Sequence, residues 1–267
     1  MNEKVDHYGS QYSNFVSELY EEIRKDAFEI DIGQNGWLTA DEQDIFIDWL
    51  ELNGESHLLD IACGSGGPTL RISEKTGCTV TGIDIHEDGI KAANTQAKSR
   101  GLTEKTSFIV SDGSTELPFE NETFDAVYCI DAINHLPDRA KVLKEWNRIL
   151  KPGGRLVFTD PITITGVISK DDIDVRSSIG YFLFAADGAD ERLLKNAGFE
   201  VKHKTDRTEN MKEMAEKWKD AREKRAGELI KAEGREAFEG QQIFFKVCEE
   251  LAKGKDLSRF AFLAVKK

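Results

Sequence analysis

Five short apolar runs alternate with amphipathic segments between residues 57 and 160, and this alternation restricts the fold more than any other feature. Nearly continuous apolar strands separated by helices are typical of a parallel sheet that helices cover on both faces. The chain is therefore predicted to adopt an α/β fold. The predicted strands are 57–62, 78–84, 106–112, 124–131 and 154–160, and the predicted helices between them are 68–76, 87–100 and 139–150.

Aspartates recur where these strands end. Asp60 lies just before the turn that follows the first strand, and the next four strands end in Asp84, Asp112, Asp131 and Asp160. Ligands of a parallel sheet bind beyond the carboxyl ends of its strands. We therefore expect these carboxyl groups to surround the functional site.

A glycine-rich turn follows the first strand, with the sequence Asp60-Ile61-Ala62-Cys63-Gly64-Ser65-Gly66-Gly67. Glycines let the backbone approach a ligand closely, and an acid about twenty residues further on, here Asp84, can accept hydrogen bonds from ribose hydroxyls. A dinucleotide site needs a third glycine where this chain has Thr69, which disfavours a nicotinamide-dependent oxidoreductase on the same fold. An acid before the turn suits a ligand that carries a positive charge.

Residues 1–53 are predicted to be helical and to form a lid. Apolar residues recur there at spacings of three and four, which is typical of one buried helix face: Tyr8, Tyr12, Phe15, Leu19 and Ile23. A break at 33–38 follows, and Thr39 and Glu42 then have the spacing of a capping box. The helix that begins there is expected to bury Ile45, Phe46, Trp49 and Leu50.

Beyond residue 160 the pattern changes to a helix at 187–197, a strand at 199–205, a charged helical block at 209–253 and a last strand at 257–265. One stripe of the block is apolar, and interleaved charges cover its other faces. We expect a helical hairpin packed on the sheet. The predicted units are the lid (1–53), a Rossmann-like core (54–208), a helical cap insertion (209–253) and the last core strand (254–267).

Composition excludes several classes of function. The formal net charge of −13 disfavours nucleic-acid binding, which needs a basic face. No run of eighteen apolar residues and no apolar signal core is present, so we expect no membrane partner and a cytoplasmic location. The four cysteines have no metal-type spacing and are expected to be reduced and buried. The oligomeric state is left open.

Residues 53–160 resemble the core of class I S-adenosylmethionine-dependent methyltransferases. The resemblance rests on the acid, glycine turn and acid described above, on Leu117-Pro118-Phe119 before Phe124-Asp125-Ala126, and on Arg148-Ile149-Leu150-Lys151-Pro152-Gly153-Gly154. It implies a seven-stranded sheet that ends in two strands at 199–205 and 257–265. It also implies S-adenosylmethionine as cofactor and a small molecule as methyl acceptor.

The resemblance further implies which residues hold the cofactor. Asp84 is expected to bind the ribose, Asp112 the adenine amino group, and Gly64 and Gly66 the methionine end. Asp60 either binds the amino group of the methionine or braces the turn, and Ala62 replaces the family's usual first glycine. The remaining expected contacts are Trp37 (a cation–π contact with the sulfonium), Ile85, Gly113 and Ile130.

A narrower resemblance involves Asp131-Ala132-Ile133-Asn134-His135. N-methyltransferases acting on phosphoethanolamine, or on glycine, sarcosine and dimethylglycine, carry a similar segment after the fourth strand. It implies His135 as general base, with Asp131 and a lid tyrosine, Tyr12, as catalytic partners. Tyr8 and Asp160 are the expected substrate-binding residues. Ile130 stands where the phosphoethanolamine enzymes have an arginine, which disfavours phosphate-bearing acceptors.

We therefore expect methyl transfer to a small molecule, with an amine nitrogen as the first choice of acceptor. O- or C-methylation of a small metabolite is the alternative, as is a catalytically inactive protein that only binds S-adenosylmethionine. The sequence shows no set of residues arranged as metal ligands, so metal-assisted methyl transfer is disfavoured. If His135 is the base, activity is expected to fall below the usual imidazole pKa of about 6.5.

Overall fold

The computed structural model describes residues 17–267 and contains one mixed sheet with the strand order β3-β2-β1-β4-β5-β8-β7. The strands from β3 to β5 are parallel, and β8 lies antiparallel between β5 and β7. This order confirms the predicted Rossmann-like methyltransferase sheet. A further strand of two residues, β6, pairs with β5. The strands are β1 (His57–Ile61), β2 (Thr79–Asp84), β3 (Thr106–Val110), β4 (Phe124–Cys129), β5 (Leu150–Ile164), β6 (Ala185–Ala186), β7 (Phe199–Asp206) and β8 (Leu257–Lys266).

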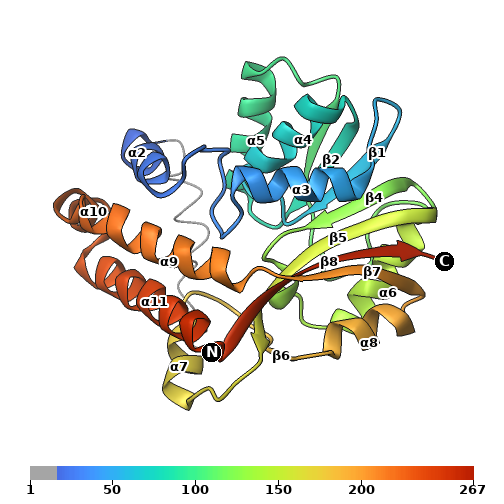
Figure 1. Ribbon diagram of the computed structural model, residues 1–267. Helices are drawn as coiled ribbons and strands as arrows, with labels where there is room; N and C mark the ends of the chain where they lie inside the picture. Colours follow the sequence, from blue (N-terminus) through green and yellow to red (C-terminus); the bar gives the residue numbers. More distant parts are fainter. Residues whose placement is uncertain (1–16) are drawn as a thin grey trace.

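Helices cover both faces of the sheet, as the alternating pattern predicts. Figure 1 shows α3, α4 and α5 on one side, α6 and α8 on the other, and α9 to α11 beyond the ends of the strands. The helices are α2 (Glu18–Ala27), α3 (Ala40–Leu50), α4 (Gly67–Thr76), α5 (Glu87–Ser99), the 3-10 turn η1 (Ile133–His135), α6 (Arg139–Ile149), α7 (Lys170–Arg176), α8 (Ala189–Asn196), α9 (Thr208–Glu223), α10 (Ala226–Glu233) and α11 (Arg235–Gly254).

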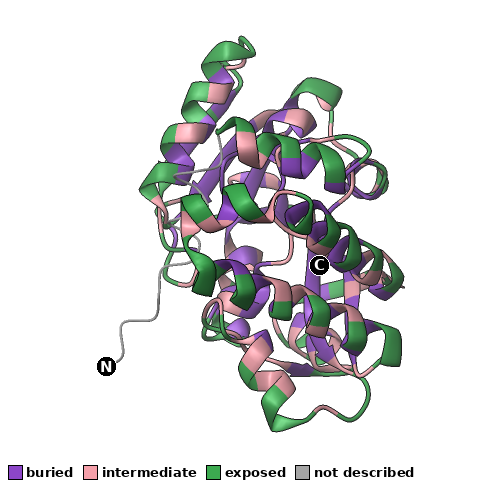
Figure 2. Cartoon of the chain, turned by 90° about the vertical axis from the view of Figure 1, so that its left-hand side faces the viewer, coloured by how far each residue is buried: buried purple, intermediate pink, exposed green. Residues whose placement is uncertain are grey.

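The buried side chains form separate clusters on the two faces of the sheet. One cluster places Trp146 of α6 against Phe158 and Phe262 of the sheet, and another packs Phe46 of α3 on Leu58. Figure 2 shows the strands buried and the outer helix surfaces exposed. Each such side chain contributes roughly 1.5–3 kcal/mol through burial. The carboxyl ends of the parallel strands are thereby held on a rigid support.

The fifth strand continues past the position at which the sequence predicts its end. β5 pairs with β8 from Arg155 to Ile164, with an irregularity between Asp160 and Thr163. The predicted end at Asp160 is therefore wrong, because the antiparallel partner β8 and the short β6 both extend the pairing. Asp160 lies inside a strand and not at its carboxyl end.

The block at 209–253 forms three helices and not the predicted hairpin. Its apolar stripe is buried as expected, because Met211, Met214 and Trp218 of α9 pack with Ile23 of α2 and Phe244 of α11. We call α9, α10 and α11 the cap. The division of the chain into a lid, a core and a cap insertion stays a prediction.

The start of α3 is predicted only in part. Thr39 caps the helix by accepting a hydrogen bond from the Glu42 backbone N–H at 3.3 Å. The Glu42 carboxylate instead binds Arg259 of β8. Ile45, predicted to be buried, is 36% exposed.

All four cysteines are free and buried, as predicted. Within residues 17–267, no helix is long and apolar enough to cross a membrane.

Candidate active site

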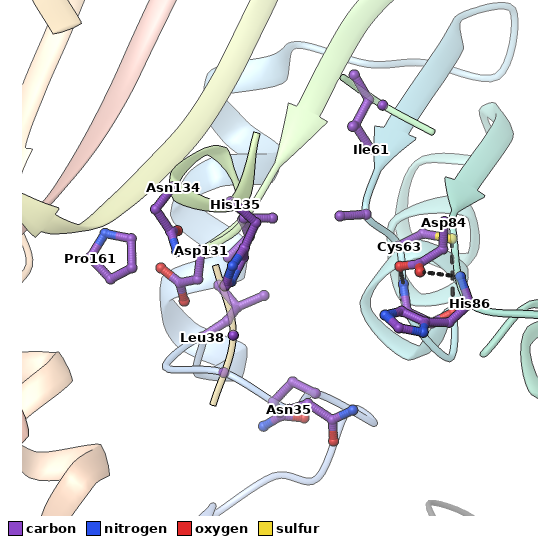
Figure 3. A pocket seen from close by; sticks show the side chains of 18 of the residues that line it. Asn35, Leu38, Ile61, Cys63, Asp84, His86, Asp131, Asn134, His135 and Pro161 are labelled. Atoms are coloured by element: carbon purple, nitrogen blue, oxygen red, sulfur yellow. Dashed lines mark hydrogen bonds between the residues drawn. The ribbon is translucent and has the colours of Figure 1, made fainter. Parts of the chain in front are cut away.

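A cavity of about 410 Å³ opens at the carboxyl ends of β1, β2 and β4. Three segments from outside the sheet complete it: the loop 31–38, which we call the lid loop, the loop 176–182, and the cap helices α9 and α11. Figure 3 shows Asp131, Asn134 and His135 on one side, Cys63, Asp84 and His86 on the other, and Asn35 and Leu38 from the lid loop. The site therefore lies where the strand pattern predicts it.

The glycine turn takes a strained path along the cavity. Ala62 has φ 60° and Gly64 has φ 54°, both in the left-handed region. This conformation costs a residue with a side chain roughly 1–2 kcal/mol, so Ala62 occupies a position at which glycine is the favoured residue. The Gly64 N–H donates to Asp84 Oδ2 at 2.9 Å. Ala62 and Gly64 both line the cavity.

The glycines after them serve packing. Gly66 is not part of the cavity lining, and a Cβ there lies 2.7 Å from the Ala93 Cβ and 3.0 Å from the Phe108 ring. Gly66 lets the start of α4 approach α5 and β3, and its cofactor contact stays a prediction. At Gly67 a Cβ lies 2.2 Å from the Ile32 carbonyl oxygen, so the lid loop rests directly on the start of α4.

Three acids line this end of the cavity. Asp84 is buried and accepts hydrogen bonds from the Gly64 and His86 N–H groups, both at 2.9 Å. Asp60 accepts one from the Thr69 hydroxyl at 2.5 Å, and burial raises the pKa of Asp60 to about 7. Asp112 is exposed and accepts from the N–H and hydroxyl of Ser114. Gly113 and Ile85, the latter 60% exposed, lie beside them.

We expect Asp84→Ala to weaken binding of S-adenosylmethionine by roughly tenfold or more, because charge-assisted hydrogen bonds to ribose hydroxyls contribute about 1.5–3 kcal/mol each. The variant also leaves the Gly64 N–H without its acceptor. Isothermal titration calorimetry measures the affinity, and Glu87→Ala, on the exposed first turn of α5, is the control. An unchanged dissociation constant would rule out the ribose assignment.

His135 lies at the opposite end of the cavity, on η1. Its Nδ1 lies 2.7 Å from the Tyr181 carbonyl oxygen, and its ring meets Phe182 edge-on. A carbonyl accepts hydrogen bonds only, so Nδ1 carries the proton and Nε2 the lone pair. Burial, together with nearby Arg176, lowers the pKa of His135 to about 4. His135 is therefore neutral at physiological pH.

Asp131 lines the cavity, but its oxygens bind structural partners. They accept hydrogen bonds from Arg259 Nε at 2.7 Å, from the Thr159 hydroxyl at 2.7 Å and from the Trp37 N–H at 3.2 Å. Arg259 is 0% exposed and also binds Glu42. Asp131 thus braces β8 against the lid loop, and its catalytic role stays a prediction.

Asp160 does not face the cavity. It is 0% exposed and accepts hydrogen bonds from Arg139 Nη1 at 2.5 Å and from the Ile162 N–H at 3.1 Å. Its predicted substrate contact is wrong, because an internal ion pair occupies the carboxylate and the next residue, Pro161, lines the cavity instead.

Tyr8 and Tyr12 lie outside the described residues. Trp37 and Ile130 line the cavity, and the Trp37 ring packs edge-on against Phe245.

Several lining residues escaped the sequence analysis. Arg176 is 2% exposed, and its guanidinium lies 4.9 Å and 5.0 Å from the Phe182 and Phe244 ring centroids. No carboxylate among residues 17–267 forms an ion pair with it. The buried Asn134 amide has no hydrogen-bond partner in that part of the chain. Asn134 stands inside the motif that singled out His135, whereas Arg176 follows no recognisable pattern.

The described part of the chain holds no group of three side chains suited to a metal ion. The cavity instead presents two chemically different ends. Backbone turns and carboxylates form the first end. The second combines a neutral imidazole, an amide and a buried arginine with aromatic rings: Trp218, Phe244, Phe245 and Phe182.

Comparison with known proteins identifies the central segment. Residues 59–158 match a family model described as a methyltransferase domain. The methyltransferase GfsG of Streptomyces halstedii is 31% identical over 166 residues, which are 60% of this chain and 58% of that protein. The sterol 24-C-methyltransferase of Debaryomyces hansenii is 30% identical over 214 residues, 74% of this chain and 55% of that protein. The chain thus spans little more than half the length of these relatives.

Solved structures match almost the whole chain. A protein from Galdieria sulphuraria, provisionally described as a sarcosine dimethylglycine methyltransferase, superposes with a TM-score of 0.80 over 97% of this chain and 98% of that one, at 20% identity. The cyclase SpnF gives 0.77 over 98% and 96%, at 21% identity. Phosphoethanolamine N-methyltransferase 2 of Haemonchus contortus, solved with S-adenosylmethionine, gives 0.77 over 96% and 59%, at 21% identity.

The names of these proteins differ in activity: the sterol enzyme is a C-methyltransferase, the phosphoethanolamine enzyme is an N-methyltransferase, and SpnF is a cyclase. The predicted N-methyltransferase type is therefore one of several in the group. The segment that matches the family model runs from β1 into β5 and carries the glycine turn, Asp60 in β1 and Asp84 at the end of β2. Residues 59–158 therefore match a methyltransferase domain, and the chain shares the fold of the solved structures above.

Proposed function

We propose that the protein transfers the methyl group of S-adenosylmethionine to an amine nitrogen of a small molecule that also carries an anionic group. One observation supports this most strongly: a single cavity joins the glycine turn to His135 and Arg176. Methyl transfer is a one-step displacement at a carbon that the sulfonium already activates. The protein therefore has to align the acceptor, exclude water and accept a proton.

The turn end of the cavity suits the cofactor. Asp84 would hold the ribose, Asp112 with Gly113 and Ile85 the adenine, and Gly64 the methionine moiety. Asp60 would bind the ammonium group of the methionine, because a nearby cation stabilises a carboxylate whose pKa burial has raised. Trp37 would face the sulfonium from the lid loop. When bound, the cofactor supplies the activated methyl group, and these residues orient it toward His135.

The acceptor end suits an anion. Arg176 is a buried cation with no ion-pair partner in the described chain, and burying an unpaired charge is costly. Two aromatic rings offset part of that cost. A carboxylate on the acceptor would offset it better, because guanidinium binds carboxylate through two parallel hydrogen bonds. Asn134 adds an amide with unused donors and an unused acceptor.

A second candidate is O- or C-methylation of an apolar acceptor. The rings of Trp218, Phe244 and Phe245 favour it, since they form an apolar wall from the cap. The similarity to a sterol 24-C-methyltransferase also favours this candidate. A protein that binds the cofactor without methyl transfer is the third possibility. A cytoplasmic location also stays a prediction.

The test is release of S-adenosylhomocysteine with pairs of acceptors that differ only in their anionic group, such as sarcosine and sarcosine amide. We expect the carboxylate form to react. Arg176→Met should raise the KM for the carboxylate acceptor by about ten- to a hundredfold, because a charge-assisted pair is lost. Arg176→Lys should raise this KM less. Turnover of uncharged acceptors alone would favour the second candidate. Cofactor binding without turnover of any acceptor would favour the third.

A further inference from the structure

The imidazole of His135 is held by the backbone of a segment that lies far away in the sequence. Residues 177–184 join α7 to β6 and form neither helix nor strand, and we call them the α7–β6 loop. The Tyr181 carbonyl oxygen of this loop lies 2.7 Å from His135 Nδ1. A neutral imidazole without such an acceptor exchanges its proton between the two ring nitrogens. The position of the loop therefore decides whether the lone pair of His135 stays on Nε2.

Leu183, two residues after Tyr181, fastens this loop to the segment that carries His135. Its N–H donates to the Asn134 carbonyl oxygen at 2.8 Å. Its own carbonyl oxygen accepts a hydrogen bond from Arg139 Nη2 at 2.7 Å. Of these two bonds, the second comes from a side chain, so a substitution can remove it.

Arg139 is itself held in place by two carboxylates. It is the first residue of α6 and is 8% exposed. Its Nη1 donates to Asp160 Oδ2 of β5 at 2.5 Å and to Asp190 Oδ1 of α8 at 2.8 Å, and both carboxylates are buried. The guanidinium is planar and rigid, so the two bonds that anchor Nη1 also fix the direction in which Nη2 points. That direction is toward the Leu183 carbonyl.

Charge balance alone does not require an arginine at this position. Burial and the charge of Asp160 raise the pKa of Asp190 to about 7, so below that pH Arg139 balances chiefly the charge of Asp160. A lysine could supply the same positive charge. Its single nitrogen, however, cannot occupy the positions of both Nη1 and Nη2. The bond to the Leu183 carbonyl is therefore what distinguishes arginine from lysine here.

We propose that Arg139 is a positioning residue for methyl transfer: by holding the Leu183 carbonyl, it keeps the Tyr181 carbonyl on His135 Nδ1 and the lone pair on Nε2. This role rests on the proposed function, because that function makes His135 accept the proton. Arg139 does not line the cavity. It therefore acts on the reaction through the α7–β6 loop and not by contact with the cofactor or the acceptor.

The α7–β6 loop also controls how far water reaches His135. Burial is the largest cause of the low pKa of His135, which is about 4. The charged groups that act on the imidazole are Arg176, which lowers this pKa, and Asp131 and Asp160, which raise it. A loop released from Arg139 would expose the imidazole to water. The pKa should then rise toward its ordinary value of about 6.5.

Arg139→Lys is the decisive variant, because it keeps the buried cation and removes the bond to the loop. Nitrogen NMR on protein with isotope-labelled histidine distinguishes the protonated from the unprotonated ring nitrogen, and His135→Ala identifies the signals of His135. We expect the wild-type protein to carry the proton on Nδ1 and to titrate near pH 4. In Arg139→Lys we expect both tautomers and a midpoint at least about one pH unit higher. The kcat should fall about ten- to a hundredfold, whereas the affinity for S-adenosylhomocysteine should stay unchanged.

A matched control separates positioning from a general loss of stability. Arg148 lies on the same helix and also donates to backbone carbonyl groups, those of Leu117 and Phe119, but it does not line the cavity. Arg148→Lys should therefore leave the tautomer and the titration of His135 unaltered.

A triple variant, Arg139→Met, Asp160→Asn, Asp190→Asn, covers the case in which Arg139→Lys does not fold. It leaves no unpaired charge in the cluster and still lacks the bond to the loop, so His135 should titrate as in Arg139→Lys. Either protein with His135 protonated on Nδ1 alone and titrating near pH 4 would overturn the proposal, as would the same changes in Arg148→Lys. If the tautomer changes as expected but the wild-type protein methylates no acceptor, the proposed function is contradicted and the positioning by Arg139 is supported.

Discussion

The variant His135→Ala is expected to lower kcat by roughly 10²–10⁴-fold, the usual contribution of a positioned proton-transfer group. The structure supports the choice of residue, because His135 lines the cavity and its Nδ1–H bond to Tyr181 leaves the lone pair on Nε2. Binding of S-adenosylhomocysteine should be retained, since the cofactor end is formed by other residues. Single-turnover kinetics and calorimetry measure the two effects.

The pH dependence follows from the direction of the pKa shift. Burial holds the pKa of His135 at about 4, so the imidazole stays neutral and able to accept a proton down to that pH. The acid limb of kcat/KM, which reports the free enzyme, is therefore expected near pH 4 and not near 6.5 as the sequence alone suggests. An anionic acceptor at Arg176 would offset the charge that lowers this pKa, so the limb of kcat should lie at higher pH.

Three outcomes would contradict the role of His135. A loss of less than about tenfold would show that alignment alone supplies the catalysis. A variant whose acid limb matches that of the wild type would show that another group titrates. The variant Tyr12→Phe tests the predicted lid partner, which lies outside the described residues. Non-additive losses in the double variant would indicate one proton-transfer unit.

Local patterns predicted the parts of the fold that depend on local interactions. Apolar runs and helical spacings placed the strands of the central sheet within a few residues, and Thr39 marked the start of α3. The glycine turn and Asp84 were found because their spacing reflects a strand–turn–helix unit. Residue type alone does not predict the backbone conformation of Ala62, which is left-handed although the residue has a side chain.

The errors come from pairings between residues far apart in the sequence. Asp160 resembles a strand-end carboxylate until Arg139 and the extension of β5 along β8 are known. The bond between Asp131 and Arg259, 128 positions away, is another such pairing that no local pattern predicts. Arg176 was missed because its importance lies in burial between two rings, and no local pattern predicts that.

Arg259→Met is expected to destabilise the protein by about 3–5 kcal/mol, which is the typical cost of breaking a buried ion pair from one side. Arg259 is 0% exposed and binds Asp131 and Glu42 at 2.7 Å each. Without it, Asp131 loses its cation and Glu42 keeps only Arg207, whose Nε lies 3.7 Å from Glu42 Oε1. Denaturant unfolding measures the change, and Arg235→Met, on the exposed start of α11, should alter stability by less than about 0.5 kcal/mol.

The cause of the loss can be separated from lost packing. Methionine fills most of the volume of the arginine stem, so the uncompensated charge of the carboxylates should dominate the loss. The triple variant Arg259→Met, Glu42→Gln, Asp131→Asn removes both carboxylates and should recover much of the stability. It keeps an amide oxygen at position 131 that can accept from the Trp37 N–H, so the lid loop retains that contact. A triple variant as unstable as Arg259→Met would show that the stem of the arginine, and not its charge, holds β8 to α3 and the lid loop.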